Sequence, residues 1–339
     1  MTGNEAVTVY LVDDSAVARV ALAAMLNAQE GVRVVGVAAT GREALSQIPK
    51  MCPSIVLLDV IMPSTNGFET ARELMSLHPV PIVLVSDLVG RNAKLSFEGF
   101  AAGAVDVVRK PSAKELQTPA TGEAWARKLR TLARVPVIRR RDSTVDPVPS
   151  SGFDEAMPAL VSVVAIGAST GGPRAIDYLL HEIGPNPPWP VLIVQHLSQG
   201  FTTGLIEWLA RDGARVEEAV NNEVPRPGVY YLAPDQHHLA LRGGRFRVTR
   251  ETQGHSPSAD ILFRSLADHA EPHRVIGILL TGMGRDGAEG LRELRAAGGW
   301  TIAEHESSCV VYGMPAAAVD AGAAREVLDL PRIAGRLKN

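Results

Sequence analysis

Aromatic residues, cysteines and surplus positive charge are all scarce in this sequence. Aromatic residues make up 5% of the 339 residues, and the formal net charge is −3 at pH 7. Nucleic-acid-binding proteins concentrate positive charge on one surface, so this composition argues against a nucleic-acid partner. The two cysteines, Cys52 and Cys309, are too few to build a zinc site, and they stand in apolar stretches where we expect buried thiols.

Long apolar segments are missing as well. The sequence has no stretch of about 18 apolar residues, the length that a transmembrane helix needs. Near the N-terminus an Asp-Asp pair follows the first apolar run, so the pattern of a secretory leader is absent. We therefore expect a soluble, cytoplasmic protein that is monomeric and does not insert into a membrane. Its length favours two domains, each large enough for its own core.

Apolar runs alternate with helical patterns over the first third of the chain. The expected strands are Val7–Val12, Val32–Val37, Ile55–Leu58, Ile82–Val85 and Ala104–Val108. The clearest helical pattern follows Ser15, a suitable N-cap, and places on one face Ala18, Leu22, Met25 and Leu26. A further helix is expected over Glu123–Ala133. This alternation predicts a doubly wound α/β domain with five parallel strands and helices on both faces of the sheet.

A segment with the composition of a linker follows this first domain. Residues 134–158 contain four prolines and the run Arg139-Arg140-Arg141, which we interpret as a solvated hinge. We therefore expect one domain over residues 1–133, a linker over 134–158 and a second domain over 159–339.

The second domain is predicted to be a mostly parallel, doubly wound α/β domain. Its expected strands are Val161–Ile166, Val191–Val194, Gly228–Ala233, Val275–Leu280 and Val310–Tyr312. Helices are expected at Pro173–Leu180 and Gly204–Arg211. A hairpin made of His238–Leu241 and Phe246–Thr249, joined at Gly243-Gly244, adds an antiparallel element.

Acidic residues and a lysine stand at the ends of expected strands in the first domain. Asp13 and Asp14 follow the first strand, Asp59 follows the third and Lys110 follows the fifth. Because parallel strands end at the same edge of a sheet, these side chains should meet there. Carboxylate oxygens are suitable ligands for Mg²⁺. A divalent cation and a fixed lysine can together neutralise a phosphoryl group that is transferred to a carboxylate.

Two further residues belong to this edge of the sheet. Ser86 follows the fourth expected strand, and its hydroxyl can bond to a phosphoryl group on Asp59. Pro111 follows Lys110, and we expect a cis peptide bond there that aims the lysine at the acidic residues. The whole set predicts a phosphoacceptor site.

These residues occur in segments that resemble the response-regulator receiver family. The matching segments are VDDS at 12–15, LLDVIMPSTNG at 57–67, VSD at 85–87 and GAVDVVRKP at 103–111. The resemblance implies a flavodoxin-like receiver in which Asp59 is phosphorylated by a histidine kinase. It also implies that Asp14 and the backbone carbonyl of Ile61 help to hold Mg²⁺. Two positions depart from the family: Val107 stands where an aromatic residue is usual, and Asn66 where aspartate is common.

A serine in the second domain lies between glycines at an expected strand-to-helix turn. The segment Gly167–Gly171 has the Gly-x-Ser-x-Gly spacing of a nucleophile elbow, in which the glycines permit a sharp turn around Ser169. A serine nucleophile needs a base, and the base needs an acid that orients it. His196 and Asp286 each follow another expected strand and should reach the same edge. The pattern predicts a Ser–His–Asp triad that cleaves acyl bonds.

Other interpretations compete with this triad. The chain order Ser, His, Asp differs from the Ser, Asp, His order of α/β-hydrolases. GASTGGP could be a nucleotide loop, but it matches neither GxGxxG nor GxxxxGK[ST]. His237, His238 and His305 are alternative bases; their spacing forms no clear metal site, and surface or structural roles are favoured. Asp260 is expected to be a helix N-cap rather than a catalytic acid.

From about Val161 to Leu330 the chain resembles the catalytic domain of chemotaxis protein-glutamate methylesterases. The matching segments are AIGASTGGP, IVQHLSQGFT, YLAPDQHHL, PSADILF, LTGMGRDGAEG and VVYGMP. The resemblance implies that Ser169 is the nucleophile, His196 the base and Asp286 the orienting acid. It also implies that the backbone amides of Thr170 and Met283 are the oxyanion donors. This domain is expected to need no cofactor, so Mg²⁺ is expected in the receiver alone.

Together the two resemblances imply a hydrolase under phosphorylation control. The expected reaction is hydrolysis of γ-glutamyl methyl esters on chemoreceptors, with deamidation of specific receptor glutamines through the same acyl-enzyme. The expected partners are the receptors and a chemotaxis histidine kinase. The contrasting hypothesis is a signalling adaptor whose receiver functions and whose esterase domain only docks on receptors. A complete triad argues against that alternative, because a binding protein has no need of it.

Overall fold

The structure is a computed structural model that describes residues 6–63, 65–86, 97, 99–100, 102–135, 158, 160–250, 256–269 and 271–338. The chain divides into two compact units, Met1–Val145 and Asp146–Asn339. Most of the predicted linker, including Arg139-Arg140-Arg141, lies outside the described residues, and the boundaries at residues 133 and 158 stay predictions. Within the described part of the chain, every helix is too short or too polar to cross a membrane.

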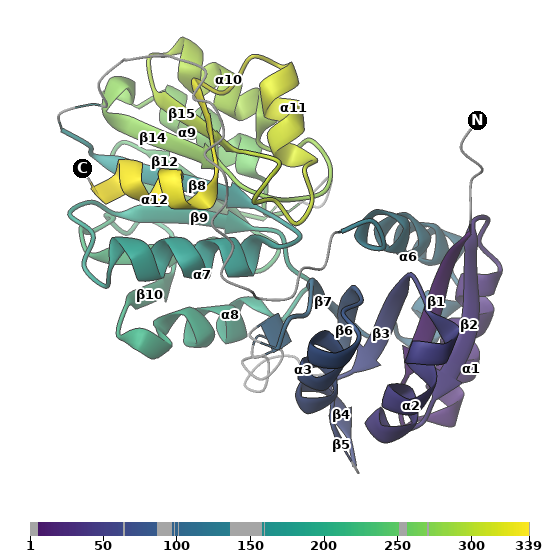
Figure 1. The fold of residues 1–339 in the computed structure, drawn as a ribbon. Coiled ribbons are helices and arrows are strands. Elements are labelled where there is room, and N and C mark those ends of the chain that lie inside the picture. The colour runs from purple at the N-terminus through teal and green to yellow at the C-terminus, as the bar shows by residue number, and fades with distance from the viewer. Residues whose placement is uncertain are drawn as a thin grey trace. The chain divides into compact units, whose positions relative to one another are not determined.

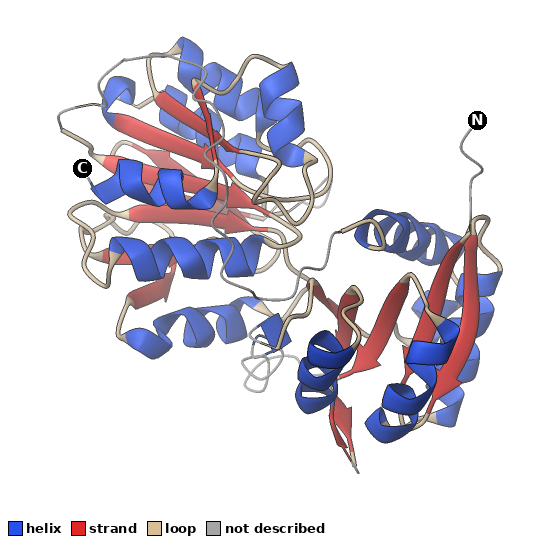
Figure 2. Ribbon diagram, viewed as in Figure 1, coloured by secondary structure: helices blue, strands red, loops and turns tan. Residues whose placement is uncertain are grey.

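The first unit contains a five-stranded parallel sheet in the order β2-β1-β3-β6-β7 (Figures 1 and 2). The strands are β1 (Val7–Val12), β2 (Val32–Ala38), β3 (Ile55–Asp59), β6 (Ile82–Ser86) and β7 (Asp106–Arg109). The helices are α1 (Ala16–Asn27), α2 (Gly41–Met51), α3 (Gly67–Leu77), α5 (Ala113–Leu116) and α6 (Pro119–Leu132). A short antiparallel ribbon pairs β4 (Ile61–Met62) with β5 (Thr65–Asn66). The predicted parallel α/β receiver fold is confirmed.

Local sequence signals explain where two of these helices begin. The Ser15 side chain accepts a hydrogen bond from the Ala18 amide and caps α1, as predicted. Asn66 caps α3 in the same way, because its side chain accepts a hydrogen bond from the Phe68 amide. The apolar face of α1 buries Leu22, Met25 and Leu26 against the sheet.

The second unit contains a seven-stranded parallel sheet in the order β10-β11-β9-β8-β14-β15-β16. The strands are β8 (Val163–Ala168), β9 (Val191–Gln195), β10 (Arg215–Glu218), β11 (Val229–Leu232), β14 (Val275–Leu279), β15 (Trp300–Glu304) and β16 (Glu326–Leu328). The predicted hairpin is present as β12 (His238–Arg242) and β13 (Arg245–Thr249). The helical segments are α7 (Gly172–Ile183), α8 (Thr202–Leu209), η2 (Ala210–Asp212), α9 (Ala259–Ala267), η3 (Pro272–Arg274), α10 (Ala288–Ala296), α11 (Met314–Asp320) and α12 (Leu330–Lys338).

The chain winds in opposite directions from the two central strands of this sheet. From β8 it passes through α7 to β9, whereas from β14 it passes through α10 to β15 on the other side. Right-handed crossovers place the connecting helices of these two paths on opposite faces. Accordingly α7 packs with α12, and α10 packs with α9 (Figure 1). The direction of winding therefore reverses between β8 and β14, and ligands bind at such a switch point in open α/β sheets.

Two predictions about local structure are wrong. Val310–Tyr312 is not a strand: Tyr312 makes an isolated bridge to Gly282, and β15 pairs instead with β16, which forms the edge of the sheet. Cys52 is exposed rather than buried, because it ends α2 with a left-handed backbone conformation (φ 43°). Cys309 is partly buried.

A buried glutamate ends β15 inside the second unit. The side chain of Glu304 has no exposed surface, and its Oε2 accepts a hydrogen bond from the Thr281 amide at 2.7 Å. Its Oε1 accepts a hydrogen bond from the Ser308 hydroxyl at 2.9 Å. Burial raises the pKa of Glu304 to about 7, although these hydrogen bonds oppose the shift. Glu304 therefore makes folding sensitive to pH.

Replacement of Glu304 by glutamine is expected to remove that sensitivity. The pKa of Glu304 is higher in the folded protein than in the unfolded chain, so the protonated carboxyl favours the folded state. Its contribution to the unfolding free energy is complete below about pH 4.5 and is lost as the pH rises through about 7. On going from pH 5 to pH 8, Glu304→Gln should gain up to about 3 kcal/mol in unfolding free energy relative to the wild type. Urea unfolding at both pH values measures this gain, with the exposed Glu306→Gln as control. Parallel pH profiles for wild type and Glu304→Gln would contradict it.

Candidate active sites

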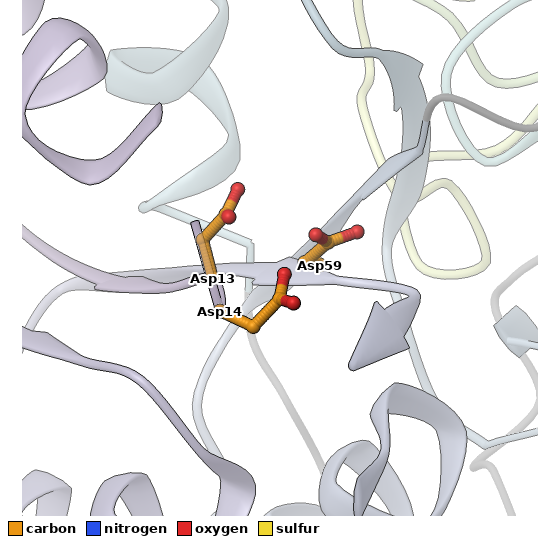
Figure 3. Close-up of side chains that lie close together, drawn as sticks. All are labelled: Asp13, Asp14 and Asp59. Carbon is orange, nitrogen blue, oxygen red and sulfur yellow. The ribbon is translucent and has the colours of Figure 1, made fainter. Parts of the chain in front are cut away.

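Three carboxylates gather at the carboxyl edge of the first sheet. Asp13 and Asp14 follow β1, and Asp59 is the last residue of the adjacent strand β3. One oxygen from each of the three lies within 4.8 Å of the others (Figure 3). Asp13 and Asp59 are buried and Asp14 is exposed. Three hard oxygen donors at this spacing, open to solvent on one side, fit a Mg²⁺ ion.

Lys110 connects two of these carboxylates. Its Nζ lies 2.7 Å from Asp13 Oδ2 and 2.9 Å from Asp59 Oδ2. Burial raises the pKa of Asp59, and the hydrogen bond from Lys110 opposes that rise. The predicted cis bond before Pro111 is wrong, since among the described residues the cis peptide bond is Ser256–Pro257. Lys110 is aimed instead by its place directly after β7, where its amide donates to the Ser86 carbonyl oxygen.

The other residues predicted for this site lie around the same edge. Ser86 ends β6 beside β3 and is buried. Ile61 belongs to β4, and its amide donates a 3.3 Å hydrogen bond to Asp59 Oδ1. Val107 lies in β7 with 7% of its surface exposed, so an aliphatic side chain fills the position that the receiver resemblance assigns to an aromatic.

The serine of the second unit lies at the predicted turn between β8 and α7. The Ser169 amide donates to the Thr281 carbonyl oxygen at 3.0 Å, and the Gly172 amide donates to the Ser169 carbonyl oxygen at 2.8 Å. Gly171 has φ 81°, a left-handed conformation that favours glycine. A Cβ on Gly171 would also approach the Val310 side chain to 2.5 Å. These contacts make the turn sharp and leave Ser169 partly exposed.

His196 lies beside Ser169 at the end of the neighbouring strand. Ala168 of β8 pairs in register with Gln195 of β9, and the His196 amide donates to the Ala168 carbonyl oxygen at 2.9 Å. His196 and Ser169 are each the next residue beyond this register pair. Adjacent strands are about 4.8 Å apart, so the two residues share one edge. The His196 Nε2 lies 2.8 Å from Asp286 Oδ2.

The Asp286 carboxylate has three further hydrogen-bond donors around it. Its Oδ1 accepts from the Ser258 hydroxyl at 2.7 Å and from the Asp260 amide at 3.2 Å. Its Oδ2 accepts from the Ala259 amide at 2.6 Å as well as facing His196. Burial alone would raise the pKa of Asp286, but the His196 contact and the hydrogen bonds lower it to about 2. The amide donors come from the first turn of α9, where a helix favours negative charge.

This arrangement corrects one prediction and adds one residue. Asp260 is not the N-cap of α9, which is Ser258; Asp260 lies in the first turn and its Oδ1 accepts from the Gly290 amide at 2.6 Å. Ser258 was not predicted to contact the site. The sequence places Ser258 directly before an apolar helix, which indicates a helix N-cap. Its hydroxyl, however, donates to Asp286 rather than bonding to its own helix.

The loop after β14 approaches Ser169 closely. A Cβ on Gly282 would lie 2.7 Å from the Ser169 Cβ, so any side chain there would collide with the serine. Met283 follows directly and is partly exposed, and Gly284 has φ 97°. On the other side Thr170 is buried, and its carbonyl oxygen accepts from the Thr281 hydroxyl at 2.9 Å.

The alternative histidines have other contacts. His237 Nδ1 lies 2.7 Å from the Asp235 carbonyl oxygen, and His305 Nδ1 lies 2.9 Å from the Ser307 hydroxyl. His238 is buried within β12, with 2% of its surface exposed. The histidine that contacts a partly buried carboxylate beside the serine turn is His196.

Family models match both units of the chain. Residues 9–119 match the response regulator receiver domain, and residues 164–337 match the CheB methylesterase family. "Protein-glutamate methylesterase/protein-glutamine glutaminase 4" of Myxococcus xanthus is 41% identical, covering 98% of this chain and 97% of its own. "Protein-glutamate methylesterase/protein-glutamine glutaminase 1" of Syntrophus aciditrophicus is 37% identical, covering 97% and 96%.

Solved structures resemble the units separately. The crystal structure of the Thermotoga maritima CheB methylesterase catalytic domain is 34% identical, with a TM-score of 0.49, over 52% of this chain and 97% of that chain. The crystal structure of the response regulator domain of T. maritima CheB is 29% identical, with a TM-score of 0.36, over 39% and 99%. Since the full-length relatives span nearly the whole sequence, the chain belongs to the CheB family of protein-glutamate methylesterases/protein-glutamine glutaminases.

Proposed function

We propose that this protein hydrolyses glutamyl methyl esters on chemoreceptors and deamidates specific receptor glutamines, with Ser169 as nucleophile. The observation that carries the proposal is the His196–Asp286 contact of 2.8 Å beside the Ser169 turn, at the switch point of the sheet. Names of the full-length relatives support the same reaction. We place the enzyme in the cytoplasm as a monomer, with domains over residues 1–133 and 159–339.

The contact of His196 with Asp286 supports a different proposed role for each ring nitrogen. Asp286, whose pKa is about 2, is ionised at neutral pH and accepts the Nε2 hydrogen. Nδ1 is then the basic nitrogen that takes the Ser169 proton as the hydroxyl attacks the ester carbonyl. The same proton passes to the leaving methoxide, which departs as methanol. Water, deprotonated by His196, opens the acyl-enzyme to glutamate; a glutamine side chain follows the same route with ammonia as the leaving group.

Backbone amides are proposed to stabilise the oxyanion. Thr170 and Met283 flank Ser169 from the elbow and from the loop after β14. The close packing of Gly282 on Ser169 supports this assignment, because it brings the amide of the next residue, Met283, close to the nucleophile. Such donors are most effective when the fold holds them in place before the reaction.

The receiver is proposed to regulate this hydrolase. Asp59 accepts a phosphoryl group from a histidine kinase, and Lys110 and Ser86 contact that group. Asp13, Asp14, Asp59 and the Ile61 carbonyl would hold a Mg²⁺ ion, which would neutralise the phosphoryl oxygens. Phosphorylation raises the hydrolytic rate, and each tenfold gain requires about 1.4 kcal/mol of coupling between the sites.

The adaptor alternative is not favoured. Asp286 is 2.6 to 3.2 Å from three donors other than His196, and these donors hold its partly buried carboxylate in contact with the histidine. A surface that only docks on receptors gains nothing from such an oriented carboxylate. An oriented base beside a partly exposed serine is the requirement of acyl transfer.

Ser169→Ala is expected to abolish methanol release from methylated receptors. Loss of the nucleophile costs roughly 10⁶-fold in kcat in serine hydrolases. Phosphorylation of Asp59 and the unfolding transition should be unchanged, and Ser162→Ala, whose hydroxyl contacts the Arg274 carbonyl, is the control. Activity above one tenth of the wild type would reject Ser169 as nucleophile.

His196→Gln and Asp286→Asn are expected to lower kcat without weakening receptor binding, and Asp286→Asn should be the milder. The acid only orients the imidazole and stabilises its cation, so part of the catalysis survives without it. Methanol release at saturating receptor measures both effects. His237→Gln and Asp260→Asn are matched controls, since both side chains hydrogen-bond nearby without touching Ser169. If His237→Gln were as damaging as His196→Gln, the base would have to be reassigned.

Asp59→Asn is expected to leave a low basal rate that no phosphodonor raises. The amide cannot form the acyl phosphate, whereas the triad is untouched. The test compares methanol release with and without a small-molecule phosphodonor. Asp106→Asn, in the same sheet but paired with Lys128 at 2.7 Å, should still respond to the donor. A donor-dependent increase in Asp59→Asn would place the phosphoacceptor elsewhere.

A further inference from the structure

Gln195 is a buried polar residue between the serine and the histidine. It is the last residue of β9, with 5% of its surface exposed, and it pairs in register with Ala168. Burial of an amide side chain is costly unless its polar atoms are hydrogen-bonded. The contacts of Gln195 therefore indicate why this position at the edge of the sheet is polar.

Both amide hydrogens of Gln195 are directed at the predicted catalytic pair. Its Nε2 lies 2.7 Å from the Ser169 carbonyl oxygen and 2.9 Å from the His196 carbonyl oxygen. Because carbonyl oxygens only accept, these neighbours identify the nitrogen end of the side chain. One side chain thus holds the peptide that follows Ser169 and the peptide that follows His196.

The oxygen of the same side chain is poorly satisfied. Within the described residues, Gln195 Oε1 is buried and has no hydrogen-bond partner. It lies against Gly172, where a Cβ would come within 2.0 Å of it. An unsatisfied buried acceptor destabilises the folded protein, and the two hydrogen bonds from Nε2 offset that loss. Their net effect on stability is therefore small, whereas both act directly on the backbone of Ser169 and His196.

Peptide planarity connects these hydrogen bonds to the oxyanion donor. The carbonyl of Ser169 and the N–H of Thr170 belong to one planar trans unit, so they point in opposite directions. The Ser169 carbonyl is held by two donors, Gln195 Nε2 and the Gly172 amide. Whatever fixes that carbonyl also fixes the direction of the Thr170 N–H.

We propose that Gln195 is a positioning residue for acyl transfer: it orients the Ser169–Thr170 peptide, and with it one oxyanion donor, and fixes the backbone of His196 relative to Ser169. This inference rests on the proposed function. It predicts that loss of the two hydrogen bonds lowers kcat and leaves KM almost unchanged, because the geometry affected is that of the transition state.

The first variant removes the donors. In the phosphorylated full-length protein, Gln195→Leu is expected to lower kcat for methanol release about 10- to 100-fold, the range for a misplaced catalytic group. KM should stay within about twofold, and thermal unfolding should be similar or improved because the unsatisfied oxygen is gone. The control is Ser265→Ala, which removes a buried hydroxyl that bonds to the Leu241 amide, away from the serine turn. Its kcat should be close to that of the wild type.

The second variant gives a readout that a structural role would not change. In Gln195→Glu, the protonated carboxyl can donate one hydrogen bond to a carbonyl, whereas the carboxylate can donate none. The ratio of variant to wild-type kcat should therefore fall at least fivefold between about pH 5.5 and pH 8.5. Because this ratio is measured on Gln195→Glu alone, it tests the inference even if Gln195→Leu fails to fold.

A labelling experiment separates this inference from the proposed reaction. Modification of Ser169 by a sulfonyl fluoride needs the positioned serine and base but no receptor. Its rate should fall about tenfold in Gln195→Leu and follow pH in Gln195→Glu. If the wild type is labelled but releases no methanol, the proposed function is wrong. The role of Gln195 is then tested by comparing the labelling rates of the wild type and the Gln195 variants. Unchanged kcat and labelling in Gln195→Leu, a loss that appears only in KM, or a pH-independent ratio for Gln195→Glu would each overturn the positioning role.

Discussion

Parallel pairing of β8 with β9 on one side and β14 on the other is the constraint on which the proposed hydrolytic site depends. It brings Ser169, His196 and the loop before Asp286 to one edge, although more than a hundred residues separate the first from the last. The receiver follows the same rule. Its winding reverses between β1 and β3, and the acidic cluster lies at the ends of those two strands. Two unrelated clusters of polar residues thus occupy equivalent places in two doubly wound sheets.

The sequence predicts the positions of residues at strand ends far better than it predicts which contacts loop residues make. Ser169, His196 and Lys110 each come directly after a strand, so their positions depend only on strand order and direction. Residues 310–312 are as apolar as a strand but pack as a loop against the segment after β14. The hydroxyl of Ser258 bonds across to Asp286, and no local pattern encodes that choice. Long-range partners of short polar side chains are therefore what sequence reasoning misses.

The carboxylate of Asp286 and the carboxylates of the receiver have different surroundings. Asp286 is a single carboxylate surrounded by donors, so its charge is satisfied within the protein. In the receiver, the carboxylates of Asp13 and Asp59 share the ammonium of Lys110, and Asp14 lies within the same acidic cluster. A bound divalent cation would be the largest local charge at such a cluster. The Asp286 carboxylate is satisfied by donors of the protein, whereas the acidic cluster of the receiver has the oxygen donors that suit a divalent ion.

The first turn of α9 and the Asp286 carboxylate form hydrogen bonds with each other. Asp286 takes the amide hydrogens of Ala259 and Asp260, which have no partner within their own helix. Fraying of that turn would release the carboxylate and let the imidazole rotate, while the sheet remained folded. Such local opening needs less free energy than global unfolding and would appear as faster hydrogen exchange at these two amides. Heat inactivation of the enzyme should accordingly be governed by one helical turn, at temperatures where the rest of the domain is still native.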